Sequence, residues 1–180
     1  VVTEVGSART FEDTVDRALA AVRDAFGYAY GSYWALDRKE NMLKFSRESG
    51  SVNDEFRRVT QTARFREGEG LSGRAWRSRD LVFTRDIGDM TDCSRAPVAQ
   101  RAGVRSGFCF PVVVGDEVVG TMDFFSNETL SPSADRLQTL KAVGGQVSEA
   151  FARLDRASEA ARVRCMMDNS PVATMFADRD

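Results

Sequence analysis

The sequence contains no histidine among its 180 residues. This excludes Ser-His-Asp and Cys-His catalysis, haem ligated by histidine, and a pH switch based on imidazole. Cysteine is also scarce: Cys93, Cys109 and Cys165 show no Cys-x-x-Cys spacing, so a zinc site has too few candidate ligands. An odd cysteine count and an N-terminus unlike a secretory leader favour reduced thiols and a cytoplasmic location. We therefore expect no metal, and we name no cofactor.

Strong net charge and long apolar runs are missing as well. The formal charge is −2, with an isoelectric point near 5.4, so no overall field favours nucleic acid or anionic lipid. The longest apolar run, Phe108 to Val114, is interrupted by Pro111 and falls far short of the roughly 20 residues that a membrane span needs. We expect neither a nucleic-acid partner nor membrane insertion in this segment. Hydrophobic and charged residues, at 42% and 29%, are typical of one globular domain.

Hydrophobic periodicity predicts both helices and strands. Apolar residues recur every three or four positions from Phe11 to Phe26, which indicates an amphipathic helix that Thr10 caps and Gly27 ends. Further helices are predicted at 53–64, 71–77 and near Pro97, and strands at 28–37, 42–48, 81–86, 107–114 and 118–126. This order predicts an α+β fold in which helices flank an antiparallel sheet.

From Pro132 the chain is predicted to form one long helix. Its a/d stripe of small and apolar residues alternates steps of three and four, which is typical of a coiled coil, and a parallel homodimer is the expected result. The stripe comprises Leu137, Leu140, Gly144, Val147, Phe151, Leu154, Ser158, Ala161 and Cys165. The alternative is a helix packed on its own sheet. That alternative carries more weight for the first two heptads, because residues 152–164 are too polar for a core helix.

Two segments and the final helix carry a resemblance to a known family. GEGLSGRAWRSRDLVFTRDI (68–87) resembles the central signature of GAF domains, and AQRAGVRSGFCFPVVVGDEVVGTMDFFS (99–126) resembles their second half. LSPSADRLQTLKAVGGQVSEAF resembles the closing helix. The resemblance spans about residues 11–154, after a lead-in at 1–10. It implies a sensory domain whose sheet forms the floor of a ligand cup, with a signalling helix over 132–169.

The last residues carry a second resemblance. MMDNSPVATMFADRD (166–180) is similar to the opening of a PAS domain, which is cut off at 170–180 after its first strand. GAF–PAS tandems resemble parts of histidine kinases, diguanylate cyclases and chemotaxis receptors. This implies a downstream PAS domain and an output domain in the same chain.

In GAF domains, the loops and short helices that follow the central signature form a lid over the cup. The resemblance therefore places the ligand region over this lid and the last strands. The residues it implies are Tyr33, Trp34, Trp76, Phe83, Asp86, Asp92, Cys93, Arg95, Arg101, Arg105, Ser106 and Asp123. Arginine can hold a carboxylate or phosphate with two hydrogen bonds, and we expect Arg105 to be the arginine that points inward. Asp123 lies in an apolar strand, so its carboxylate must be exposed or paired with an arginine or a ligand amine.

Cys93 and Cys109 are candidates for redox chemistry. Positive charge from Arg95 would favour the thiolate form of Cys93. Cys109 lies in a predicted strand, which favours its alternative role as a small buried hydrophobic residue. In bilin-binding GAF domains a cysteine at this place is followed by histidine, whereas Ser94 follows here, so bilin is not expected.

These observations favour a small-molecule sensor that relays occupancy through a dimeric helix. Two alternatives stay open: a thiol or chromophore sensor built on Cys93, and a ligand-free dimerisation and relay module. We expect no enzyme, because no nucleophile–base pair or metal cluster occurs at a recognisable spacing.

Overall fold

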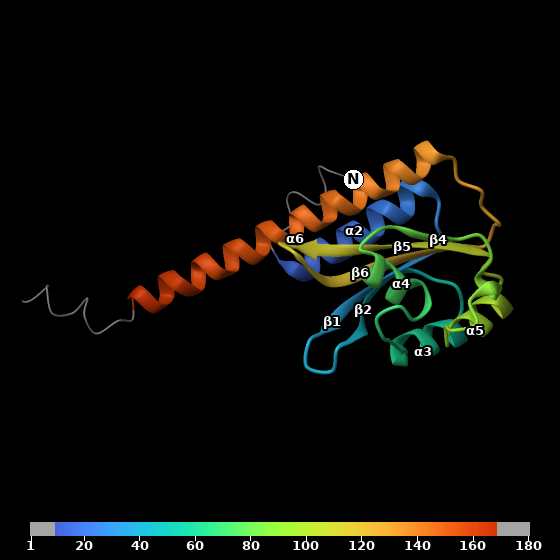
Figure 1. Ribbon diagram of the computed structural model, residues 1–180, viewed down its shortest axis with the longest axis horizontal. Coiled ribbons are helices and arrows are strands. Elements are labelled where there is room, and N and C mark those ends of the chain that lie inside the picture. Colours follow the sequence, from blue (N-terminus) through green and yellow to red (C-terminus); the bar gives the residue numbers. More distant parts are fainter. Residues whose placement is uncertain (1–9, 169–180) are drawn as a thin grey trace, which may run out of the picture.

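The computed structural model describes residues 10–168, which form a twisted antiparallel sheet between two layers of helices (Figure 1). Its helices are α2 (Phe11–Phe26), α3 (Asp54–Thr62), α4 (Gly70–Ser78), the 3₁₀ helix η1 (Ile87–Asp89), α5 (Ala96–Arg101) and α6 (Ala134–Asp168). Its strands are β1 (Tyr30–Asp37), β2 (Met42–Gly50), β3 (Arg64–Phe65), β4 (Val82–Thr84), β5 (Ser106–Val114) and β6 (Glu117–Ser126). The predicted α+β class is confirmed.

Local sequence explains where the first helix begins and ends. The Thr10 hydroxyl accepts a hydrogen bond from the Asp13 amide at 3.1 Å, which satisfies one of the free N–H groups at the start of α2. Gly27 ends the helix at φ +73°, a left-handed conformation that glycine adopts without strain. The bounds of α2 therefore match the prediction.

The six strands are ordered β3-β2-β1-β6-β5-β4, so β1 and β6 are central. Two irregularities interrupt the pairing, between Tyr33 and Trp34 against β2 and between Val112 and Val113 against β6. A bulge shifts which side chains face which side of a sheet. At the second bulge, the Val113 amide donates to the Ser148 hydroxyl of α6 at 3.0 Å.

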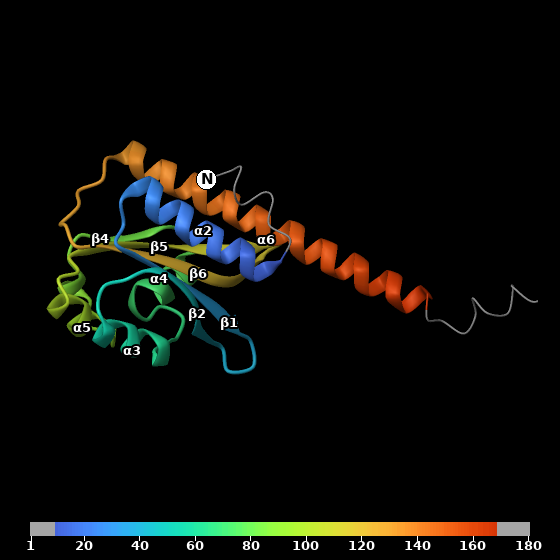
Figure 2. The same cartoon turned by 180° about the vertical axis from the view of Figure 1, so that it is seen from behind.

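Each face of the sheet has its own hydrophobic core. Helices α2 and α6 lie side by side over one face, as both views show, and they bury a core that includes Leu19, Phe108, Phe124 and Phe151 (Figures 1 and 2). The shorter helices α3, α4 and α5 cover the opposite face. The core there includes Trp34, together with aromatic residues from four other elements.

The first part of helix α6 packs on the domain, and its second part projects away from it. Leu140, Val147 and Phe151 of the predicted dimer stripe are buried in the domain's own core. Gly144 allows close packing, because a Cβ there would lie 3.0 Å from Cγ of Phe110. This part of the stripe packs on its own sheet, since its helix covers β5. A replacement at Phe151 would therefore damage the fold itself.

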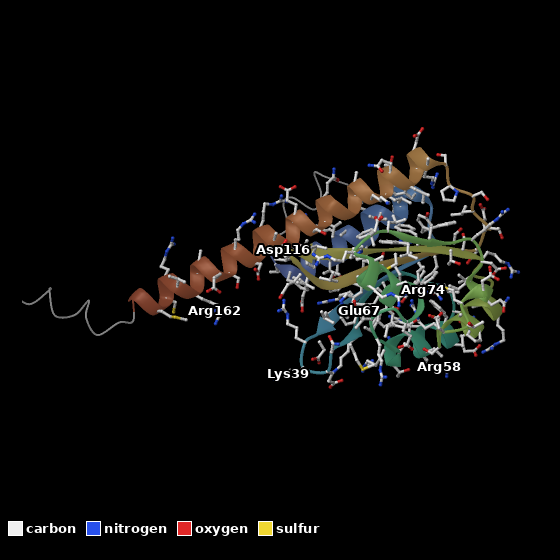
Figure 3. All side chains as sticks on the ribbon, in the orientation of Figure 1. Lys39, Arg58, Glu67, Arg74, Asp116 and Arg162 are labelled. Carbon is white, nitrogen blue, oxygen red and sulfur yellow. The ribbon has the colours of Figure 1, made fainter. Side chains whose placement is uncertain are left out.

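Beyond Leu154, which is half-buried, α6 projects away from the domain (Figure 1). Ser158 and Ala161 of the stripe are exposed there, and Figure 3 shows Arg162 on the same projecting part. Within residues 10–168, no helix is both long enough and apolar enough to cross a membrane. The predicted start of a PAS domain at 170–180 lies outside the described residues.

Replacing Phe151 by Ala should lower the free energy of unfolding by about 3–5 kcal/mol, because it leaves a cavity among aromatic rings. The ring of Phe151 lies 4.7 Å from that of Phe11 and 5.6 Å from that of Tyr33, centroid to centroid. Urea denaturation measures the change. Arg153→Ala, at an exposed position two residues on, should change stability by less than about 0.5 kcal/mol. Equal effects of the two replacements would contradict the assignment of Phe151 to the core.

Candidate functional site

A buried carboxylate lies at the centre of the sheet on the side of α3, α4 and α5. Asp123 of β6 is fully buried, and it shares its face with Thr121 and Phe125, whereas Met122 and Phe124 face α2 and α6. Strict alternation along β6 would put Val119 on the same face as Asp123. The bulge opposite Val112 and Val113 moves Val119 to the other side instead.

Four donors from three parts of the fold converge on this carboxylate. The Ser32 hydroxyl of β1 donates to Oδ1 of Asp123, while Nε1 of Trp34 donates to Oδ2 at 3.0 Å. The Ser72 hydroxyl of α4 donates to Oδ2 at 3.1 Å. The fourth donor is Nη2 of Arg95, which forms an ion pair with the same oxygen. Both oxygens of the buried carboxylate therefore have hydrogen-bond donors, as buried polar groups require.

Arg95 comes from the loop that leads into α5, and its side chain fills the space above Asp123. Only 2% of Arg95 is exposed. Burial alone would lower the pKa of its guanidinium, but the negative charge of Asp123 outweighs that effect and holds the pKa above its ordinary value. Its carbon Cζ lies 4.6 Å from the ring centroid of Trp34, close enough for a cation–π interaction.

The loop that bears Arg95 is tied to α4 through Asp92. That side chain accepts hydrogen bonds from the Gly70 amide at 3.0 Å and from Arg74 at 2.8 Å; Arg74 is labelled in Figure 3. Partial desolvation raises the pKa of Asp92, but these hydrogen bonds leave it below its usual value. Gly70 has φ +59°, and a Cβ there would lie 3.3 Å from Sγ of Cys93. Asp92 therefore fixes the lid rather than facing the buried cluster.

The structure brings together some of the residues implied by the resemblance. Trp34, Trp76, Cys93, Arg95 and Asp123 belong to or border the lid-side core. Trp34 and Asp123 are central strand residues on one face, and Arg95 reaches them from the lid. These residues, rather than the full set, form the candidate site.

Other predicted site residues lie elsewhere. Tyr33 alternates with Trp34 along β1, so it faces α6 instead of the lid, and Phe83 also packs on that side. Asp86 is exposed and accepts a hydrogen bond from the Gly88 amide at 2.8 Å, which caps η1. Arg101 pairs with Glu55 at an exposed position.

Arg105 and Ser106 differ most from expectation. Arg105 is exposed, so the arginine that points inward is Arg95 and not Arg105. Ser106 is buried, but its hydroxyl donates to the Glu128 carbonyl at 2.7 Å and so anchors the segment between β6 and α6. Neither side chain reaches the buried cluster.

The two redox candidates are both buried free thiols. Burial raises the pKa of the Cys109 thiol well above its usual value, so this group is protonated at neutral pH. Oxidation by peroxide proceeds through the thiolate, and access to solvent promotes it. The environment of Cys109 therefore disfavours a role as a resolving thiol.

Sequence reasoning missed the two serines and most of the aromatic residues at the site. Ser32 and Ser72 carry no sequence signal beyond their place in a strand and a helix. Phe56, Phe65 and Phe125 surround Arg95 from α3, β3 and β6, with ring centroids between 5.1 and 5.6 Å from its Cζ. Their convergence depends on long-range packing.

Comparison with protein families decides the classification. The GAF domain family matches residues 8–152, which is most of the chain. The chain belongs to the GAF domain family. This confirms the resemblance drawn from residues 68–87 and 99–126. No curated protein sequence matches the chain significantly.

Solved GAF structures share the fold at low sequence identity. The GAF domain of a phosphoenolpyruvate-protein phosphotransferase from Coxiella burnetii is 16% identical with a TM-score of 0.72, covering 88% of this chain and 92% of that one. A domain of a putative two-component sensor histidine kinase from Sinorhizobium meliloti is 15% identical with a TM-score of 0.66, covering 86% and 99%. A free methionine-R-sulfoxide reductase from Neisseria meningitidis, in complex with its substrate, is 17% identical with a TM-score of 0.71, covering 87% and 86%.

The reductase corrects one expectation. We expected no enzyme, because the sequence shows no recognisable catalytic pair. That expectation was wrong, since a second free methionine-R-sulfoxide reductase, from Staphylococcus aureus, has the same fold. GAF domains are mostly regulatory, yet this fold also supports catalysis, and a missing motif carries no argument against it.

A double-mutant cycle should show strong coupling between Arg95 and Asp123. Asp123→Asn and Arg95→Met each leave a buried charge without its partner, so each should cost about 3–5 kcal/mol of unfolding free energy. The double variant should cost at least about 2 kcal/mol less than the sum, as urea denaturation would show.

The exposed pair Arg101–Glu55 provides the matched control for that cycle. Its nitrogen–oxygen distance is 2.7 Å, but both side chains are at least half exposed. Arg101→Met and Glu55→Gln should therefore show a coupling below about 1 kcal/mol. Additive effects at Arg95 and Asp123 would mean that the buried pair is not a functional unit of the fold.

Proposed function

We propose that this GAF domain is a ligand-sensing regulatory module of a cytoplasmic signalling protein, with its sensor site at Asp123. One observation carries the proposal: a charged cluster is buried beneath a lid, in a place where a hydrophobic core would be the simpler solution. Replacing a buried ion pair by apolar side chains is often neutral or stabilising, so stability alone does not explain the cluster. Ligand exchange at the lid does explain it.

The proposed relay runs through the sheet to α6. Asp123 lies between Met122 and Phe124, whose side chains pack on the opposite face in the core shared by α2 and α6. Strand β5 pairs with β6 and is bonded to α6 through Val113 and Ser148. A change in the donors around Asp123 therefore shifts the strands on which α6 rests, and α6 carries the shift outward.

The reduced, buried thiols Cys93 and Cys109 support the cytoplasmic setting. The alternative of a redox sensor based on Cys93 stays a prediction, and the burial of both thiols weighs against it. A relay module without a ligand also stays a prediction. It requires Asp123 and Arg95 to serve packing alone.

The sensor proposal is tested with a panel of amino acids, amines, nucleotides and sugar phosphates in a thermal-shift assay. We expect at least one compound class to raise the melting temperature of the wild type by several degrees, because a ligand that binds only the folded state stabilises it. The Ser72→Ala variant loses a donor to Asp123 and should show a smaller rise in melting temperature. Ser78→Ala, at the exposed end of the same helix, should show the same rise as the wild type. A panel without any stabilising compound would contradict the proposal.

The output side requires a partner for the projecting part of α6, and we propose a second copy of this chain in parallel. Val163 and Met166 are exposed there by 46% and 64%. A groove of about 560 Å³ lies where α6 leaves the domain, lined in part by Phe11, Val119 and Leu154. The dimer stripe in this part would consist of Leu154, Ser158, Ala161 and Cys165.

Ala161→Glu should shift the molecule to a monomer at tens of micromolar, because it places two like charges in the seam of the dimer. Ala160→Glu introduces the same side chain at the adjacent exposed position, outside the stripe, and should leave the dimer intact. Light scattering and the unfolding curve distinguish assembly from folding. A monomeric wild type, or equal behaviour of the two variants, would contradict the dimer.

A further inference from the structure

Four aromatic rings surround the guanidinium group of Arg95 above the Asp123 carboxylate. The distances from Cζ to the ring centroids are 4.6 Å for Trp34, 5.1 Å for Phe125, 5.4 Å for Phe65 and 5.6 Å for Phe56. The faces of aromatic rings attract cations, and a cage of such rings is the usual protein site for methylated ammonium groups. A carboxylate at the end of the cage adds charge complementarity. The site therefore has the chemistry of a receptor for an organic cation.

Arg95 occupies this cage with an incomplete set of hydrogen bonds. Nη2 donates to Asp123, whereas Nε and Nη1 are buried and have no hydrogen-bond partner among residues 10–168. Each buried N–H group without an acceptor costs free energy relative to water. The guanidinium carries more donors than the cage can satisfy, so a cation with fewer N–H groups would match it better.

Without Arg95, the Asp123 carboxylate would lack a compensating positive charge, but it would still have hydrogen-bond donors. Ser32, Trp34 and Ser72 already donate to Asp123 and remain in place when Arg95 leaves. A replacement for Arg95 must therefore supply one positive charge and at most one N–H group. A tertiary or quaternary ammonium group fits this description, whereas a primary amine brings two N–H groups that would stay unpaired.

Charge balance also favours a cation over an anion. Arg95 and Asp123 together carry no net charge, so an anion added to the buried pair would leave one uncompensated negative charge in a dry site. A cation that enters as Arg95 leaves keeps the site neutral. Arg95 then gains hydration for the three N–H groups on Nε and Nη1, which lack partners in the closed form.

The position of Arg95 in the lid makes such an exchange feasible. It lies directly before α5, a helix of six residues, and its side chain makes no capping hydrogen bond. Exposed ion pairs, from Asp92 to Arg74 and from Arg101 to Glu55, hold the lid to the rest of the domain. The small buried side chains of Cys93, Ala96 and Ala99 hold it as well. Release of Arg95 therefore requires these small side chains to leave the core together with the loop, whereas β1, β5 and β6 are held by their own strand pairing.

We propose that Arg95 is an internal substitute for the ligand, and that the cup binds a small methylated ammonium compound which displaces it. This inference rests on the proposed sensor function of the same site and names its ligand class. The lid is closed on Arg95 when the ligand is absent, and ligand binding releases Arg95 to solvent.

The test uses tetramethylammonium and choline as probes, with 3,3-dimethylbutan-1-ol as the neutral counterpart of choline. Removal of Arg95 leaves the cage without its competitor, so Arg95→Ala should bind the two cations at least tenfold more tightly than the wild type does. Thermal shift and tryptophan fluorescence give the dissociation constants. The neutral alcohol should have no effect, and Arg101→Ala, at the exposed lid arginine, should behave as the wild type. Binding that persists in Arg95→Ala/Asp123→Asn, or an equal response to the alcohol, would overturn the proposal.

A second measurement needs no variant at the cage and therefore decides the case even if Arg95→Ala does not fold. The indole N–H of Trp34 donates to Asp123, so its NMR signal reports on the site directly. Trp76→Phe assigns this signal, since the sequence contains two tryptophans. Saturable shifts with tetramethylammonium support the proposal, and unchanged spectra overturn it. Shifts with acetate or phosphate instead would overturn the cation assignment while the sensor function of the site stands.

Discussion

The structure depends on one buried carboxylate. Asp123 accepts hydrogen bonds from β1, α4 and the lid, and these elements lie far apart in the sequence. Without its donors, this charge would be too costly to bury. The strand pairing of β1 with β6, the placement of α4 and the closure of the lid are therefore coupled through a single group. Any ligand that changes one of these donors acts on all three elements.

The two faces of the sheet differ in chemical character. The core under α2 and α6 consists of apolar and aromatic side chains, which suits a part of the domain that stays constant. The opposite face combines aromatic rings with an ion pair in which Asp123 is fully hydrogen-bonded, whereas Arg95 lacks partners for Nε and Nη1. A buried ion pair stabilises the fold only while both partners are present. Removing one partner leaves the other as an uncompensated buried charge, which is strongly destabilising. The proposed sensor function requires both properties: a site whose stability depends on its occupant, and a rigid connection to α6.

Sequence alone was sufficient for the main elements and the family. Thr10 and Gly27 mark the ends of α2, and the order of helices and strands in residues 68–126 points to the GAF fold. The site was harder to predict. The bulge between Val112 and Val113 changes the facing of residues in β6, and no local signal marks it. A short helix such as α5 spans less than two turns, so periodicity could not distinguish the buried Arg95 from the exposed Arg105.

The dimer stripe shows a further limit of pattern reading. Leu140, Val147 and Phe151 follow the spacing of a coiled coil, but the same spacing suits a helix that packs on a sheet. Tertiary context decides between the two, and here it assigns these residues to the domain's own core. The cage around Arg95 could not be foreseen for a similar reason. Phe56, Phe65 and Phe125 meet only because α3, β3 and β6 are brought together by the chain as a whole.

Helix α6 continues from the domain core into solvent without a break, and this continuity has a mechanical consequence. The part beyond Leu154 is about 20 Å long at 1.5 Å per residue, and it projects away from the domain (Figure 1). A tilt of about 5° at the sheet would displace its far end by about 2 Å, following from that length. The part from Ala134 to Leu154 that lies along the domain is about 30 Å long by the same measure, and the two parts form one continuous helix. Any tilt of α6 on the sheet therefore moves the end of the helix that lies outside the domain.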